Sequence, residues 1–351
     1  MAHRVSRRTL LGSGLATAGT TLALSNVASA ASPTTTTTTA PIPPTPTTGQ
    51  TKEYWIVAES FRHNLVPTGK DLMMGMTFKP KDSSYTAIGF RAYTPGWKAP
   101  IASNLDIGPN TGIPGPIIRA NVGDTVLVHF KNLDHHYKWP HSMHTHGFRY
   151  TPASDGAYIQ GNGKAPGTAV AYGDHYTYTW TALPSSEGTW LYHDHSVQEG
   201  LTKAGPVMEM GAELGMFGMV AVTSPTTPPV DVENFVFFHD LYQADVPELA
   251  QDFDCFNGQA YLGNTQEFTA KVGQKVRWRV AALGKEFHVF HIHGHRWAPS
   301  NGTGFVDSQI LGPSTTLTVE YEEDNPGSWL YHCHVTDHTA GGMVGSYVVT
   351  I

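Results

Sequence analysis

The sequence predicts an all-β protein. Glycine and proline are plentiful, at 36 and 24 of 351 residues, and only 15% of the residues are charged. Valine, threonine and tyrosine recur in short alternating runs, as they do in strands, and no long amphipathic helical pattern is evident. With 40% hydrophobic residues, the chain is long enough to bury the cores of two domains.

The N-terminal segment predicts export. Arg7 and Arg8 are followed by a small-residue apolar run and then by Ala-Ser-Ala at 28–30, which is the pattern of a twin-arginine signal peptide spanning residues 1–30. An ordinary secretory signal is the alternative, and both predict an extracellular or cell-envelope protein. The apolar run is too short and too interrupted for a stable transmembrane helix, so we expect no membrane span.

The remaining chain divides into a spacer and two predicted domains. Residues 31–50 are rich in Thr and Pro and lack the apolar residues that would repay ordering, so we expect a disordered spacer. A second Pro/Thr cluster at 224–229 predicts a linker between domains at 51–223 and 230–351. An internal repeat supports this division, because GTWLYHDH at 188–195 matches GSWLYHCH at 327–334 almost residue for residue.

Charge and cysteine content exclude some classes of protein. The net charge of −7 predicts no nucleic-acid partner. Two cysteines cannot form a disulfide framework. The unusual residue is histidine, with 19 in the chain.

Eight histidines form four H-x-H triplets. Side chains alternate along a strand, so both histidines of a triplet share one face and make half of a metal site. One triplet alone would favour a surface or packed histidine, since imidazole binds copper, zinc and iron alike. Four triplets at matched places in a repeated sequence indicate metal sites. They are His144/His146, His193/His195, His291/His293 and His332/His334.

A second metal site is predicted around Cys333. His338 and Met343 follow it at intervals of five residues, and His288 lies upstream. Two histidines, a thiolate and a weak methionine are the ligands of a blue copper site, whereas zinc has little use for a thioether and iron would more often take a carboxylate. The alternatives are a buried apolar cysteine and a core methionine.

The tripeptide 332–334 links these two kinds of site. Cys333 faces one side of its strand, and His332 and His334 face the other. Single electrons that arrive at Cys333 can therefore reach a multi-electron acceptor, and one blue copper with a three-copper cluster stores the four electrons that dioxygen requires. In the first half Asp194 stands at the position of Cys333, and Glu199 at that of His338. We therefore expect one electron-entry site, in the second half.

These motifs, in this order, resemble the four copper signatures of multicopper oxidases. The two-domain length, with the thiolate in the second domain, is similar to bacterial two-domain (small) laccases over residues 51–351. The resemblance implies two cupredoxin-like Greek-key β-barrels and four coppers per chain: one type 1, one type 2 and two type 3. It also implies one-electron oxidation of phenols, aromatic amines or similar donors, coupled to reduction of dioxygen to water.

The resemblance assigns ten of the 19 histidines to copper. The type 1 ligands are His288, Cys333 and His338, with axial Met343. The type 2 ligands are His144 and His291. The type 3 ligands are His146, His193, His195, His293, His332 and His334. The other nine are interpreted as structural or solvent-facing: His3, His63, His129, His135, His136, His141, His175, His239 and His295.

Assembly and proton supply are also implied. In two-domain laccases the cluster is assembled between the first domain of one chain and the second of its neighbour, which implies a homotrimer, although the sequence itself shows only that each domain has half the ligands. Tyr150 and Asp155 match positions near the cluster, where Asp155 could relay protons and Tyr150 could donate an electron or simply pack. Asp307 is a weaker candidate acid. A methionine run at Met208, Met210, Met216 and Met219 could bind copper ions, but packing is the favoured interpretation.

Two other functions are weighed against an oxidase. Copper nitrite reductase also has two such domains, but its thiolate copper is in the first domain and it lacks the full double set of H-x-H pairs. A copper-binding electron-transfer protein without turnover would need only the Cys333 site. The physiological donor stays open, because outer-sphere transfer requires only access to a type 1 histidine.

Overall fold

The computed structural model describes residues 49–158, 167–202, 205–299 and 302–351. The export signal predicted for residues 1–30 lies outside the described residues, as does the predicted spacer apart from residues 49 and 50. Gln50 is already joined to the fold, since its backbone N–H donates to Oδ1 of Asp124 at 2.9 Å.

Strands dominate the described residues, so the all-β prediction is confirmed. The two α-helices are short, α1 (Met210–Glu213) and α2 (Thr336–Gly341). Three 3-10 turns each begin with proline, whose fixed φ suits the first position of a helical turn. They are η2 (Pro80–Asp82), η3 (Pro152–Ser154) and η4 (Pro184–Ser186). No helix in the described ranges is long and apolar enough to cross a membrane.

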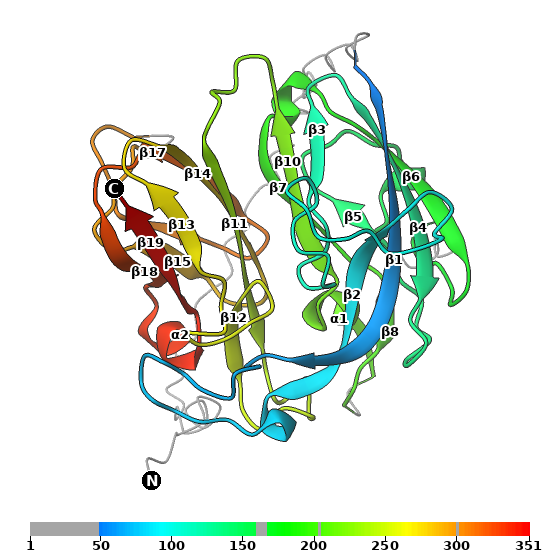
Figure 1. Ribbon diagram of the computed structural model, residues 1–351. Coiled ribbons are helices and arrows are strands. Elements are labelled where there is room, and N and C mark those ends of the chain that lie inside the picture. The colour runs from blue at the N-terminus through cyan, green and yellow to red at the C-terminus, as the bar shows by residue number, and fades with distance from the viewer. Residues whose placement is uncertain (1–48, 159–166, 203–204, 300–301) are drawn as a thin grey trace, which may run out of the picture. The chain divides into compact units, whose positions relative to one another are not determined.

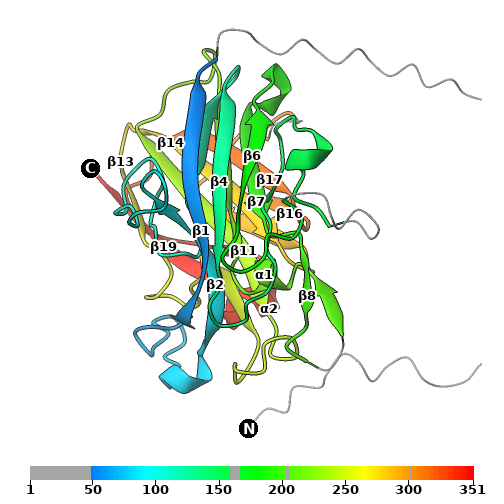
Figure 2. The same ribbon diagram turned by 90° about the vertical axis from the view of Figure 1, so that its right-hand side faces the viewer.

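The first half of the chain forms two four-stranded sheets and a small hairpin. The hairpin pairs β8 (Val197–Glu199) with β9 (Pro206–Met208). One sheet has the order β2 (Ser84–Tyr93), β1 (Thr51–Asn64), β4 (Thr125–Leu133), β6 (His175–Thr181), and Figure 2 shows β1 beside β4. The other has the order β3 (Ile118–Asn121), β10 (Phe217–Thr223), β7 (Gly188–His193), β5 (His144–Thr145).

The second half repeats this topology with one added edge strand (Figure 1). One sheet has the order β12 (Phe253–Phe256), β11 (Val232–Leu241), β14 (Lys275–Leu283), β17 (Thr316–Glu322). The other has the order β13 (Phe268–Lys271), β19 (Val344–Thr350), β18 (Gly327–Cys333), β15 (His288–Ile292), β16 (Ser308–Leu311).

The strand orders match position by position between the two halves. In each half the first long strand runs parallel to the strand beside it, β1 to β4 and β11 to β14. Neighbours in a sheet are mostly distant in sequence, as in Greek-key connections. The structure therefore bears out the duplication read from the repeat, and β5, β7 and β10 correspond to β15, β18 and β19.

Alternating side chains build the core. Along β4 every second side chain is buried, beginning with Val126, as expected for a strand with one face against the core. The apolar core of the first half continues into the second, because Phe217 stacks on Phe237 with ring centroids 4.2 Å apart. The described residues, from 49 onward, belong to one compact unit, so the domain boundaries at 51–223 and 230–351, with the linker 224–229, stay predictions.

Candidate metal centres

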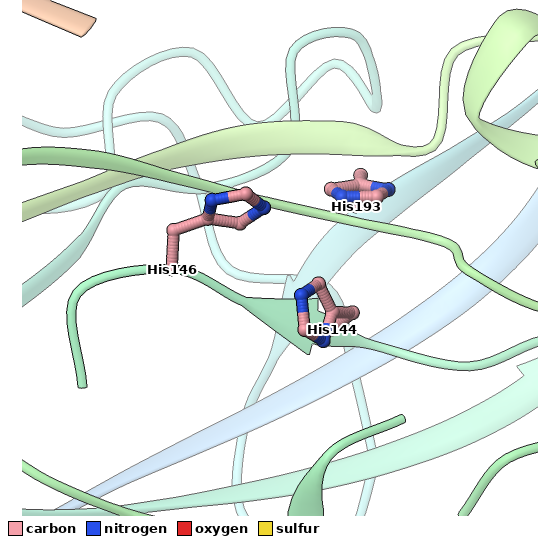
Figure 3. A group of neighbouring side chains, drawn as sticks. All are labelled: His144, His146 and His193. Carbon is pink, nitrogen blue, oxygen red and sulfur yellow. The ribbon is translucent and has the colours of Figure 1, made fainter. Parts of the chain in front are cut away.

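Four predicted histidines of the first half meet where β5 and β7 end. His144 in β5 is paired with His193 in β7, and His146 and His195 follow these strands. Ring centroids of neighbouring members lie 5.1 to 5.6 Å apart. One ligand nitrogen from each of His144, His146 and His193 lies within 4.8 Å of the others, and Figure 3 shows the three imidazoles around a common space.

Backbone carbonyls orient these imidazoles. Nδ1 of His144 donates to the carbonyl of Asp155 at 2.7 Å, and Nδ1 of His193 donates to that of Asp194 at 3.0 Å. A protonated Nδ1 leaves Nε2 free to bind a metal. Burial is the main cause that lowers the pKa of His146 to about 4 and of His193 to about 3. Both are therefore neutral at pH 7, which is the form that ligates.

The second half repeats this arrangement. His291 in β15 is paired with His332 in β18, and the Nε2 atoms of His293 and His332 are 3.1 Å apart. Nδ1 of His291 donates to the carbonyl of Asp307 at 2.7 Å, and Nδ1 of His332 to that of Cys333 at 2.8 Å. His334 completes the set, with ring centroids 5.1 Å from His291 and 5.3 Å from His332.

The predicted thiolate site also comes together. Sγ of Cys333 lies 3.9 Å from Nδ1 of His288 and 3.6 Å from Nδ1 of His338, and these two nitrogens are 3.2 Å apart. Met343 is fully buried in the same apolar cluster as Cys333. Burial raises the pKa of Cys333 to about 11, so a metal must displace its proton. Two imidazoles, a thiol and a thioether are a donor set that suits copper.

Acidic side chains lie behind the imidazoles of this site, and sequence reasoning missed them. Oε2 of Glu286 is 3.0 Å from Nε2 of His338, and Oδ2 of Asp240 is 3.5 Å from Nε2 of His288. The side chain of Asp240 is only 1% exposed, so this carboxylate is buried behind His288. Burial raises the pKa of Asp240 and of Asp254, its partner across β11 and β12. No motif marks these acids, because the pairing of β11 with β12 and the loop between β14 and β15 bring them to the site.

The other candidate residues divide between the site and the core. Oδ1 of Asp155 is 3.3 Å from Nδ1 of His144. The ring of Tyr150 meets that of His144 edge-on at 6.0 Å, and burial together with the Asp155 carboxylate raises the pKa of Tyr150 to about 12. Asp307 meets His291 through its backbone carbonyl. Three of the four methionines of the run are buried in the core and one is exposed: Met210, Met216 and Met219 inside, Met208 outside.

Two further contacts to the histidine sets were not foreseen. Oε1 of Glu209 lies 3.2 Å from Nε2 of His195. In the second half, Nδ1 of His295 donates to the carbonyl of His293 at 2.7 Å, and its Nε2 lies 2.8 Å from Oε1 of buried Glu323. The only sequence signal for His295 is its position two residues after a triplet.

The two histidine sets are separate within one chain. Among the described residues, no ring contact and no group of converging ligand atoms joins a member of the first-half set to one of the second-half set. In the second-half set His293 and His334 are exposed to solvent, whereas His193 in the first-half set is buried. Among the described residues, each set therefore brings its own imidazoles together, and the two sets do not meet.

Two family models, both described as multicopper oxidase, match residues 101–226 and 238–351. A probable nitrite reductase-hydroxylamine oxidoreductase fusion protein from Kuenenia stuttgartiensis is 30% identical over 68% of this chain and 27% of its own length. The human ferroxidase HEPHL1 is 28% identical over 86% of this chain and 29% of its own length. The chain thus spans less than a third of these curated relatives.

Solved structures share the fold. A blue copper oxidase from Nitrosomonas europaea matches with a TM-score of 0.62 at 23% identity, covering 86% of each chain. A copper nitrite reductase from the same organism matches with a TM-score of 0.63 at 20% identity, covering 86% of this chain and 94% of its own. The cupredoxin-like fold class is therefore confirmed. With both halves matched by models of one family, the chain belongs to the multicopper oxidases, which are copper-dependent oxidoreductases.

Proposed function

We propose that this multicopper oxidase is a laccase-type enzyme that oxidises phenols, aromatic amines or similar donors one electron at a time and reduces dioxygen to water. The observation that carries the proposal is the tripeptide at the end of β18. His332 belongs to the second-half histidine set, and Cys333 belongs to the thiolate site. A plain electron carrier would need only the second of these.

Four coppers per chain would fill the sites that the chain offers. His288, Cys333 and His338 would hold the type 1 copper, with Met343 axial. His144 and His291 would hold the type 2 copper. The type 3 pair would be held by His146, His193, His195, His293, His332 and His334. When bound, these coppers supply a one-electron acceptor and a store of four electrons for dioxygen.

The chain's own residues position the ligands and handle protons. Four histidines, one from each H-x-H triplet, donate their Nδ1 protons to backbone carbonyls. The accepting carbonyls are those of Asp155, Asp194, Asp307 and Cys333. Reduction of one dioxygen to two waters consumes four electrons and four protons. The carboxylate of Asp155, 3.3 Å from Nδ1 of His144, is placed to hold a proton beside the first-half set.

We further propose assembly into a homotrimer. The first-half and second-half sets are apart within a chain, and the second-half set is partly open to solvent. A head-to-tail contact that closes a ring would bring the first half of one chain to the second half of the next. The clusters would then lie at subunit interfaces. The Arg7-Arg8 pattern supports export as a further part of the proposal.

A metal-ion oxidase is the second candidate, favoured by one specific observation. Asp240, Asp254 and His338 each offer a ligand atom within 4.8 Å of the others, and Glu286 lies beside His338. Acidic oxygens would bind a divalent cation next to a type 1 ligand. The relative HEPHL1 is named a ferroxidase, and Glu286→Gln separates the two candidates. It should lower ferrous-ion oxidation and leave phenol oxidation unchanged in a metal-ion oxidase, with exposed Glu267→Gln as the control.

Copper loading of the full chain tests the oxidase itself. About four coppers per chain, an intense thiolate absorption and donor-dependent oxygen uptake are expected. Cys333→Ser should abolish the absorption and the uptake. Cys255→Ser is the matched control, because Cys255 is a buried free cysteine outside the ligand groups. One copper per chain without oxygen uptake would mean an electron carrier. Donor oxidation that consumes nitrite and leaves dioxygen unconsumed would favour the reductase alternative.

A further inference from the structure

The first half contains a counterpart of the thiolate site. The backbone N–H of Asp194 donates to the carbonyl of Met216 at 3.0 Å, and that of Cys333 donates to the carbonyl of Met343 at 3.1 Å. The glycine before each methionine has nearly the same positive φ, 124° in the first half and 125° in the second. Asp194 and Met216 therefore occupy the places of the thiolate and of its axial partner.

A buried histidine completes the correspondence. His141 precedes His144 by three residues, as His288 precedes His291. Nδ1 of His141 lies 3.0 Å from Oδ2 of Asp194, whereas Nδ1 of His288 lies 3.9 Å from the sulfur of Cys333. The same nitrogen is thus turned toward the same position in both halves. One site has a carboxylate at that position, and the other has a thiol.

Gln198 supplies the remaining contact. Its Nε2 donates to Oδ2 of Asp194 at 2.6 Å, which is the role that His338 has toward Cys333 in the second half. Sequence spacing pointed instead to Glu199, but Glu199 is exposed and Gln198 is buried. The difference follows from β8, where neighbouring side chains take opposite faces.

A cation of the protein itself lies between the carboxylates of this counterpart. His141 lies between two carboxylates, with Nδ1 toward Asp194 at 3.0 Å and Nε2 toward Asp134 at 3.2 Å, and all three side chains are fully buried. An imidazole that meets a carboxylate at each nitrogen is protonated, since both nitrogens must donate. Burial alone would lower its pKa, but the two carboxylates raise the pKa of His141 to about 9.

The network is tied to two histidines of the cluster set. Asp194 lies between His193 and His195 in sequence, and its carbonyl accepts from Nδ1 of His193. Oγ of Ser142 accepts from the backbone N–H of His195 at 3.0 Å and donates to Oδ1 of Asp194 at 3.2 Å. Movement of the Asp194 carboxylate would therefore shift the backbone on which both histidines stand.

We propose that Asp134, His141, Asp194 and Gln198 are positioning residues that replace a bound metal in the first half and hold His193 and His195 in the geometry that the copper cluster needs. In the second half, ligands from three segments are available to be joined by one metal ion. In the first half, an imidazolium joins the equivalent segments through hydrogen bonds. The proposal rests on the proposed function in so far as it assigns His193 and His195 to copper.

Copper titration of the full chain tests the positioning role. His141→Gln should weaken copper binding at the cluster by about 10- to 100-fold, the usual effect of losing a group that orients metal ligands. The thiolate absorption from Cys333 should remain and serves as an internal measure of folding. His63→Gln is the matched control, because His63 is a half-buried histidine whose Nε2 donates to the carbonyl of Gly258 at 2.7 Å and whose ring packs against Phe61 and Tyr85. Unchanged cluster affinity in His141→Gln would overturn the proposal. Failure of the proposed function would look different, because the unsubstituted chain would then hold no copper beyond the thiolate one.

Restoring the ligands tests the correspondence independently. The double variant Asp194→Cys with Gln198→His would place a thiol and a second imidazole beside His141 and Met216. Copper loading should then give about twice the thiolate absorption per chain. A folded double variant with unchanged absorption would contradict the counterpart, and this readout does not depend on oxygen uptake.

Discussion

His332 and Cys333 are adjacent residues of β18, and their side chains enter two different groups of ligands. Nε2 of His332 lies 3.1 Å from that of His293, while Sγ of Cys333 lies 3.6 Å from Nδ1 of His338. Alternation along the strand produces this division. A single peptide unit therefore connects the thiolate site with the second-half histidine set, without requiring any movement of the chain.

If clusters form between chains, two inactive variants should complement each other. His144→Gln disables the first-half set and His291→Gln disables the second-half set, so each homotrimer should lack oxygen uptake. Mixed trimers made by co-expression contain interfaces with two intact halves, and random mixing should restore about a quarter of the unsubstituted activity. Oxygen uptake of the purified mixture measures this. An intrachain cluster would leave the mixture inactive.

Copper affinity at the thiolate site should rise with pH. Burial holds the pKa of Cys333 at about 11 in the metal-free protein, so binding releases a proton at neutral pH. Each unit of increasing pH below that value should strengthen binding by about tenfold. Competition with a chelator at pH 6, 7 and 8, corrected for protonation of the chelator, gives the slope. Affinity that does not vary with pH would mean that the thiol is already ionised.

The stability of the metal-free protein should fall on the alkaline side because of His141. Its folded pKa of about 9 exceeds the unfolded value near 6.5, so its contribution is complete below about pH 6.5 and is lost as pH rises through 9. Burial alone would raise the pKa values of Asp134 and Asp194, but both are lowered by the charge and hydrogen bonds of His141 together with other hydrogen-bond donors around each carboxylate. Their contribution is accordingly present above about pH 4 and is lost in acid.

His141→Leu should therefore cost about 3 to 5 kcal/mol near pH 6, because two buried carboxylates lose their cation. The variant should also lose the alkaline slope between about pH 6.5 and 9. Urea unfolding at pH 6, 7.5 and 9 measures both effects. His63→Leu should keep that slope, since burial lowers the pKa of His63. A His141 variant that retains the slope would place the titrating group elsewhere.

Asp155→Asn should slow dioxygen reduction by about 100-fold through loss of a proton-holding group. The backbone carbonyl that orients His144 remains in this variant, so copper content should not change. Stopped-flow mixing distinguishes the two half-reactions: bleaching of the thiolate absorption by donor without oxygen should be unaffected, and recovery on adding oxygen should be slow. Asp307→Asn is the control in the second half, where the carboxylate meets the hydroxyl of Ser308. Equal recovery rates in all three proteins would remove Asp155 from proton supply.

The sequence alone determined the all-β class, the duplication and the ligand types. Each depends on local pattern: alternation with a period of two, triplets that put two histidines on one face, and a cysteine with a histidine and a methionine at fixed intervals after it. The repeat of residues 188–195 at 327–334 also identified Asp194 as the residue in the place of Cys333. These features are readable because a few neighbouring residues carry all of the information.

Only the tertiary structure decided which distant residues surround the ligands. Asp240 meets the imidazole of His288, and Glu286 meets that of His338. These contacts cross strands and loops, and no short sequence motif predicts them. Gln198 takes the place that spacing assigned to Glu199, because the face that β8 turns toward Asp194 depends on how the β8–β9 hairpin packs on the rest of the fold. Register between strands is a long-range property set by packing of whole sheets, whereas ligand spacing is written within one strand.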